Sequence, residues 1–404
     1  MKHRKSLIHS FLLIVGIILI VSHPCNIVAQ TSVGLSVDTL ELADQKMQAY
    51  IDEAKLSCIS TLVLKDGKVA HQSTFGLANI EEERAVNEET IFRIYSMSKP
   101  ITAAALMILY DEGKFQLDDP VANHIAEFTD TKVWEDGEEV GQVEPFTIRH
   151  LLTHTAGFTY GGDKNAHVDS LYASARKGSE SETATLESWM KFIAGVPLKN
   201  QPGTKYEYSI SIDVAGYLIE VLSGMSFDKF LQTRVFGPLG MDDSGFEVPE
   251  EDYGRLAMIY TPDNESGELK PVEKMTNGVK KKVLLFSSGG GMVSTIGDYG
   301  KFGQMLLNGG ELNGVRILEE STVKMITSDQ YPKTASTEVF ASYGLGGYVD
   351  LETGKYGWSG AASTDFVLDV KNNMVILTFT QYTPFMGEPF VKEFNELVEK
   401  AMLE

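Results

Sequence analysis

The stretch Phe92-Arg93-Ile94-Tyr95-Ser96-Met97-Ser98-Lys99-Pro100 leads directly into an almost continuous apolar run from Ile101 to Tyr110. A helix that is apolar on every side is buried, and Pro100 falls where the first turn of a helix tolerates proline. Ser96 and Lys99 are three residues apart, so this helix would present them on one face. Because a dry site disfavours the ammonium form of a lysine, we expect Lys99 to accept or relay the proton of a nucleophilic Ser96.

The S-x-x-K spacing is not specific by itself, because it occurs at four other places in the chain. The surroundings of those pairs are polar or amphipathic, and the ordinary interpretation there is a solvated lysine near a helix-capping serine. The four pairs are Ser174/Lys177, Ser188/Lys191, Ser226/Lys229 and Ser321/Lys324.

Tyr208 is a candidate for a second proton carrier. It follows the Pro202-Gly203 loop and precedes a helix expected near Ser211. A phenolate beside a lysine ammonium is stabilised, so Tyr208 could act as a general base, a role worth about 10²–10⁴ in rate. Without the serine motif, Tyr208 would be interpreted as an ordinary core aromatic residue.

The segment Gly357-Trp358-Ser359-Gly360-Ala361 is the third candidate element, in a strand expected near the C-terminal end. Acyl transfer requires rigid donors for the negative oxygen of the tetrahedral intermediate, each worth about 3–4 kcal/mol of barrier. Gly360 allows close backbone approach, so we expect the N–H groups of Ala361 and Ser96 to be these donors.

These segments resemble the serine β-lactamase and penicillin-binding-protein fold group. Within it, the sequence is similar to the β-lactamase-related serine hydrolases, which include class C β-lactamases, D-aminopeptidases and carboxylesterases. The resemblance runs from about residue 45 to 382. Besides the S-x-x-K motif, it rests on residues 148–157, Pro202-Gly203-Thr204 with Tyr208-Ser209, residues 236–241 and residues 289–295.

Two departures from the family pattern bear on the substrate. Ile210 stands where the family's Y-x-N motif has asparagine, and Trp358 stands where β-lactam-processing members have lysine or histidine. An isoleucine cannot hydrogen-bond a substrate amide, and a tryptophan cannot pair with a substrate carboxylate. The resemblance therefore implies the esterase branch, with an uncharged acyl group held in a cleft between Trp358 and Tyr208. It also places Ile210 among the substrate-binding residues.

The pattern along the chain predicts an α/β (α+β) fold of β-lactamase type. Helical spacing at 40–54, a hairpin around Asp66-Gly67, strands at 343–350, 355–360, 364–370 and 374–381, and a closing helix after Pro389 place the strands at both ends. We expect one antiparallel sheet from both chain ends, flanked by helices, with a mostly helical insertion. The sheet part covers roughly 30–115 and 285–404, and the helical part 116–284, within a single catalytic domain at 30–404.

Several other features receive ordinary interpretations. His150 and His154 have the spacing of zinc peptidases, but Leu151 stands where that motif requires glutamate, so we expect no metal there. The glycines at 289–291 should form a tight turn. The segments 163–185 and 247–282 are polar and Gly- and Pro-punctuated, and we expect them to be mobile.

Residues 1–29 have the pattern of an export signal: three basic side chains, an apolar run from Phe11 to Val21, and a cleavage site near Ala29. We expect an exported, periplasmic or secreted protein with no stable membrane insertion after cleavage; an uncleaved anchor is the alternative. The remaining 32 basic and 56 acidic residues leave a net charge of −24, which repels phosphate backbones and argues against nucleic acid as a partner. Cys58 then has no disulfide partner.

The leading hypothesis is an exported serine hydrolase that acts on small-molecule esters or amides through acyl-Ser96 and requires no metal or organic cofactor. A second hypothesis keeps the acyl-enzyme but assigns D-amino-acid peptides or β-lactams as substrates. A third is a catalytically silent binding or sensor module on the same fold. The sequence leaves the natural substrate and the oligomeric state open.

Overall fold

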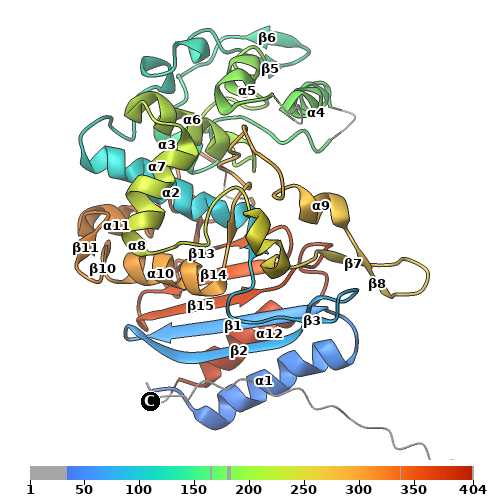
Figure 1. The fold of residues 1–404 in the computed structure, drawn as a ribbon. Helices are drawn as coiled ribbons and strands as arrows, with labels where there is room; N and C mark the ends of the chain where they lie inside the picture. Colours follow the sequence, from blue (N-terminus) through green and yellow to red (C-terminus); the bar gives the residue numbers. More distant parts are fainter. Residues whose placement is uncertain (1–33, 164–165, 180–182, 337, 403–404) are drawn as a thin grey trace, which may run out of the picture.

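A seven-stranded antiparallel sheet is the centre of the computed structural model, which describes residues 34–163, 166–179, 183–336 and 338–402 (Figure 1). The export signal expected at 1–29 lies outside these residues. The first strand of the chain pairs with the last, with Ser60 opposite Phe379. The strand order is β12 (Tyr348–Val349), β13 (Lys355–Gly360), β14 (Thr364–Asp369), β15 (Met374–Phe379), β1 (Cys58–Lys65), β2 (Lys68–Asn79) and β3 (Arg84–Ala85).

The alternation of side chains along β1 explains why the sheet is buried on both faces. Leu62 belongs to the large core cluster on one side, whereas Ile59 and Val63 belong to the smaller cluster on the other. Asp66 and Gly67 connect β1 to β2 with φ values of 51° and 73°, as expected for a two-residue hairpin turn.

Helices cover both faces of the sheet (Figure 1). On one face lie α1 (Val37–Asp52) and α12 (Phe390–Lys400), whose apolar sides pack on the smaller cluster. On the other face lies α10 (Ile296–Leu307), where Gly303 brings the helix so close that a Cβ would be 2.8 Å from Val375. The fold class predicted from the sequence is therefore confirmed.

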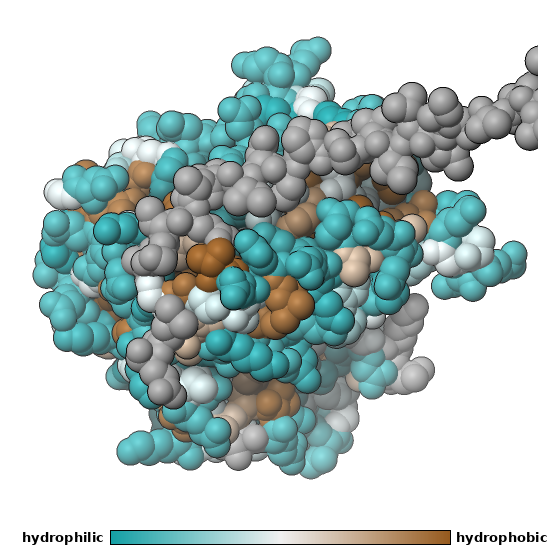
Figure 2. Space-filling model, turned by 90° about the horizontal axis from the view of Figure 1, so that it is seen from below, coloured by the Kyte–Doolittle hydropathy of each residue, from teal (hydrophilic) through white to brown (hydrophobic). Residues whose placement is uncertain are grey.

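The outward side of α1 is mainly hydrophilic, with small separate hydrophobic areas (Figure 2). This pattern follows from the amphipathic sequence, because Leu40, Ala43 and Met47 are buried while Leu42 is exposed. None of the helices in the described part of the chain is long and apolar enough to span a bilayer.

The region between the sheet segments is mostly helical. It begins with the buried helix α2 (Ser98–Asp111), every residue of which from Ser98 to Leu109 is buried as predicted. Its other helices are α3 (Ile148–Leu152), α4 (His167–Ser179), α5 (Leu186–Ile193), α6 (Ser211–Ser223), α7 (Phe227–Leu231), α8 (Gly237–Leu239) and α9 (Glu273–Asn277). The helix α11 (Glu320–Ile326) follows α10. The short strand pairs are β4 (Phe92–Arg93) with β9 (Val293–Ser294), β5 (Val133–Glu135) with β6 (Glu138–Val140), β7 (Tyr260–Pro262) with β8 (Leu269–Pro271), and β10 (Glu311–Leu312) with β11 (Val315–Arg316).

One local prediction was wrong, and two segments contain elements that were not predicted. The strand expected at 343–350 is only the two-residue β12. The segment 163–185 contains α4, because Val168, Tyr172 and Ala175 form a buried stripe at helical spacing. The segment 247–282 contains the β7–β8 hairpin and α9.

Candidate active site

Ser96 lies in a tight 3-10 turn, Tyr95–Met97, between β4 and the buried helix α2. Tyr95 adopts a φ of 44° there, and Ser98 Oγ donates a hydrogen bond to the Tyr95 carbonyl (2.6 Å). The Tyr299 hydroxyl donates to the Met97 carbonyl (2.9 Å). Because side chains from both α2 and α10 hold this turn, the position of the Ser96 hydroxyl is fixed by the core.

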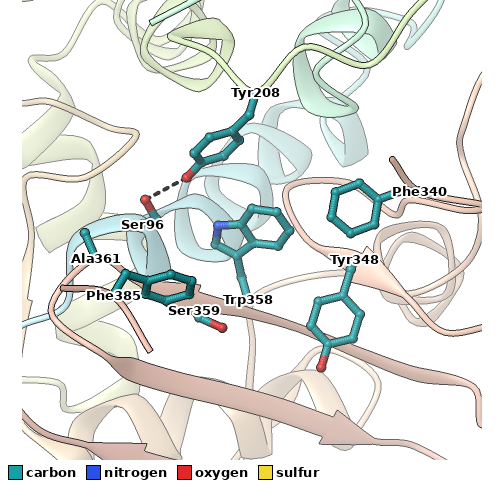
Figure 3. Close-up of a pocket in the computed structure, with 8 residues that line it drawn as sticks. All are labelled: Ser96, Tyr208, Phe340, Tyr348, Trp358, Ser359, Ala361 and Phe385. Atoms are coloured by element: carbon teal, nitrogen blue, oxygen red, sulfur yellow. Dashed lines mark hydrogen bonds between the residues drawn. The ribbon is translucent and has the colours of Figure 1, made fainter. Parts of the chain in front are cut away.

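The structure brings both Lys99 and Tyr208 within hydrogen-bond distance of Ser96. Figure 3 shows the contact between Ser96 and Tyr208. Ser96 Oγ accepts from the Tyr208 hydroxyl (2.7 Å) and from Lys99 Nζ (3.2 Å). Lys99 is 0% exposed, and its Nζ lies 4.6 Å from the centre of the Tyr208 ring. A proton can therefore pass from the serine to either neighbour without crossing bulk water.

Lys99 has two further partners, neither of which was predicted from the sequence. Its Nζ donates to the carbonyl of Gly289 (2.7 Å) and to the hydroxyl of Tyr160 (3.3 Å). Gly289 belongs to the glycine run that was predicted, correctly, to turn before α10. Tyr160 lies three residues after the family-like segment 148–157, but no motif marks it as part of the site.

His154 packs behind Tyr208, with ring centres 4.9 Å apart. Burial, with a smaller contribution from the charge of Lys99, holds the pKa of His154 well below its ordinary value. Its Nδ1 lies 3.3 Å from Ser209 Oγ. This imidazole is therefore neutral and supports the tyrosine ring.

His150 has a local role in helix α3. It forms a capping box with Thr147, whose side chain accepts from the His150 N–H while His150 Nδ1 accepts from the Thr147 N–H. Burial lowers the pKa of His150 to about 4.

Strand β13 approaches the turn that carries Ser96. A Cβ on Gly360 would lie 2.3 Å from the Ile94 carbonyl oxygen, so this position requires glycine. Ala361 lies beside Ser96 (Figure 3), and the N–H groups of these two residues remain the predicted oxyanion donors. Ser359 donates to Asp365 Oδ1 (2.6 Å), which directs its hydroxyl away from Ser96.

A cavity of about 460 Å³ opens at Ser96. Among the residues that the structure describes, none that lines this cavity is charged. Trp358 was predicted as a wall residue, whereas three of the other aromatic side chains were missed because they come from segments without a sequence motif. The lining residues are Ser96, Tyr208, Phe340, Tyr348, Trp358, Ser359, Ala361 and Phe385.

The predicted role of Ile210 in substrate binding is not supported by its position. Its side chain is 2% exposed, belongs to the large core cluster and does not line the cavity. Because α6 begins directly after Ile210, the side chain is packed among apolar helices.

A serine, lysine and tyrosine in mutual contact, at the junction of an antiparallel sheet and a helical region, define the serine β-lactamase and penicillin-binding-protein class. The family model described as "Beta-lactamase" matches residues 43–398, and the chain belongs to this family.

Among similar proteins, "Protein Rv1367c" of Mycobacterium tuberculosis is 28% identical over 82% of this chain and 88% of its own length. "Esterase EstB" of Burkholderia gladioli is 32% identical over 61% of this chain and 60% of its own. The solved structure of "EstCE1, a hydrolase with promiscuous acyltransferase activity" superposes with a TM-score of 0.77 at 25% identity, covering 89% of this chain and 98% of that one.

Proposed function

We propose that this protein hydrolyses carboxylic esters of small apolar acids or alcohols through a covalent acyl-Ser96 intermediate. The observation that carries the proposal is the position of Ser96 Oγ: it contacts Tyr208 and Lys99 on one side and faces an uncharged, aromatic cavity on the other. Apolar acyl or alkoxy groups gain free energy by entering such a cavity.

The reaction follows from these contacts. Ser96 Oγ forms a bond to the substrate carbonyl carbon, its proton passes to the phenolate of Tyr208, and the carbonyl π pair moves onto oxygen. The N–H groups of Ser96 and Ala361 stabilise that oxygen. As the C–O bond to the leaving group breaks, Tyr208 returns the proton to the departing alkoxide. Water then repeats the sequence and releases the acid.

An ester substrate is favoured over a β-lactam or a D-amino-acid peptide. The latter two carry a carboxylate or a charged terminus, and no lining side chain of the described cavity can pair with one. Trp358 instead offers an apolar surface, with its ring centre 5.6 Å from that of Tyr208. The similarity to an esterase and to a hydrolase with promiscuous acyltransferase activity supports the same assignment.

The test compares p-nitrophenyl butyrate with nitrocefin and D-alanine p-nitroanilide, using the wild type and Ser96→Ala. We expect hydrolysis of the ester, at least 100-fold lower kcat/KM for the other two, and no turnover by Ser96→Ala. Preferred turnover of nitrocefin or of the D-amino-acid amide would refute the ester assignment. Failure of a fluorophosphonate to label Ser96 would instead favour a silent binding module.

We further propose that the protein is exported after removal of residues 1–29. The basic start, the apolar run from Phe11 to Val21 and Ala29 support this location. N-terminal sequencing of protein from a periplasmic or culture fraction should begin near Gln30, and a mature chain that retains Met1 would refute cleavage.

A further inference from the structure

Asp213 is a buried carboxylate close to the candidate site that the proposed reaction does not use. It is the third residue of α6, is 2% exposed and does not line the cavity. Its Oδ1 accepts hydrogen bonds from Ser287 Oγ (2.8 Å) and from the N–H of Gly289 (3.1 Å). A carboxylate in such a dry position needs both donors and a counter-charge.

Gly289 connects this carboxylate to Lys99. Asp213 holds the N–H of Gly289, and the carbonyl of the same residue receives the shortest hydrogen bond of Lys99 Nζ, at 2.7 Å. A Cβ on Gly289 would lie 2.8 Å from Asp213 Oδ2 and 3.3 Å from the Tyr160 hydroxyl. One glycine therefore separates the carboxylate from the ammonium and its partner Tyr160.

The loop around Gly289 is also fixed to two helices by the residue before it. Ser288 Oγ donates to the Ile212 carbonyl at the start of α6 (2.8 Å). Thr102 Oγ1, on α2, donates to the Ser288 carbonyl (2.7 Å). The loop thus has little freedom to move, and the distance between the two charges is set by the fold.

The groups that face Lys99 come from the loop after α3, the loop before α6, and α6 itself. Tyr208 and Tyr160 place their rings 4.6 Å and 5.7 Å from Nζ, and the neutral His154 lies behind Tyr208. On the Gly289 side of Lys99 lies the carboxylate of Asp213. Burial raises the pKa of Asp213, while the Gly289 N–H, the charge of Lys99 and the Ser287 hydroxyl act in the opposite direction.

We propose that Asp213 is a positioning residue that places a counter-charge behind Lys99 and fixes the Gly289 loop that holds the lysine, so that Tyr208 is the base that takes the Ser96 proton. This inference rests on the proposed acyl-serine function. It assigns distinct roles to two groups that both contact Ser96: the lysine supplies positive charge, and the tyrosine carries the proton.

The test uses Asp213→Asn, which keeps an oxygen acceptor for Ser287 and Gly289 but removes the charge. We expect kcat for p-nitrophenyl butyrate to fall about 10- to 100-fold, with KM within about twofold of the wild type because Asp213 does not touch the cavity. If Asp213 is the counter-charge, its removal should move the alkaline limb of the pH profile to lower pH by about one unit.

Asp369→Asn is the matched control. Asp369 is also buried and hydrogen-bonded, but it lies at the C-terminal end of β14 and has no contact with the Gly289 loop in the described structure. It should change neither kcat nor the pH profile. If Asp213→Asn does not fold, Ser287→Ala removes one donor to the carboxylate and should lower kcat severalfold at unchanged KM.

The rate of fluorophosphonate labelling of Ser96, measured across the same pH range, gives a readout that does not depend on the substrate. Labelling of the wild type without ester turnover would refute the ester proposal and still test Asp213. An unshifted pH profile for Asp213→Asn, in turnover and in labelling, would overturn the role of Asp213 as counter-charge.

Discussion

The hydroxyl of Tyr160 lies 3.3 Å from Lys99 Nζ, and Tyr160→Phe removes that hydroxyl while leaving the ring in place. Lys99 would keep its contacts with Gly289 (2.7 Å) and Ser96 (3.2 Å). A hydrogen bond to a charged group contributes about 1.5–3 kcal/mol. The contact is long for this kind of bond, so the lower value of about 1.5 kcal/mol applies, which is roughly tenfold in kcat/KM.

Tyr208→Phe provides the comparison, because it removes the proposed base and should lower kcat/KM by about 10²–10⁴. Both variants would be assayed with p-nitrophenyl butyrate at pH 8, and circular dichroism would verify folding. Tyr172→Phe is the control, since the buried Tyr172 hydroxyl has no hydrogen-bond partner in the described structure. It should retain wild-type activity.

The expected order of activity is wild type, then Tyr160→Phe, then Tyr208→Phe. Equal losses in the two variants would refute the assignment of Tyr208 as the sole base. Wild-type activity in Tyr160→Phe would show that the third contact of Lys99 contributes nothing to the rate.

Three further predictions concern the cavity, the strand beside it and the helix cap. Trp358→Ala removes an aromatic wall, and steady-state kinetics should show a loss of kcat/KM about tenfold greater for p-nitrophenyl hexanoate than for the acetate; equal losses would argue against this wall as the acyl site. Gly360→Ala places a methyl group 2.3 Å from the Ile94 carbonyl oxygen, so chemical denaturation should show a destabilisation of about 1–3 kcal/mol. Gly254→Ala, which meets no atom within 4 Å, should show none. His150 has a pKa of about 4 in the folded protein, whereas an unfolded histidine binds a proton near pH 6.5. The wild-type protein should therefore lose stability as the pH falls from about 6.5 toward 4. His150→Gln keeps an S/T-x-x-Q capping box but cannot be protonated, so its stability relative to the wild type should improve over that range in urea titrations at pH 7, 5.5 and 4.5; a constant difference would refute the role of His150.

The parts of the fold that could be predicted from sequence are those with a local physical signature. Continuous apolar character identified the buried helix α2, and Asp66-Gly67 identified the first hairpin. The same kind of pattern at Val168, Tyr172 and Ala175 was masked by the polar residues around it, so α4 was missed.

The candidate site divides in the same way. Ser96 and Lys99 share one turn of chain, so their contact follows from helix geometry. Tyr160 and Gly289 contact Lys99, and Asp213 contacts Gly289, only through the packing of three distant segments. Single residues of common types carry no signal of that packing. Ile210 shows the converse error, because its motif position was predicted to contact the substrate, whereas its side chain is buried at the start of α6.

The pairing of β1 with β15 has a consequence for how the polypeptide matures. Thr380 Oγ1 donates to the Cys58 carbonyl across 322 positions of sequence, and this pairing joins the N-terminal hairpin to the C-terminal strands, among which β13 approaches the turn that carries Ser96. Contacts between residues so far apart in the sequence form late and slow the folding reaction. During synthesis, nearly the whole chain must therefore leave the ribosome before the N-terminal hairpin can pair with β15. A fragment ending before Met374 lacks β15 and should have no hydrolytic centre.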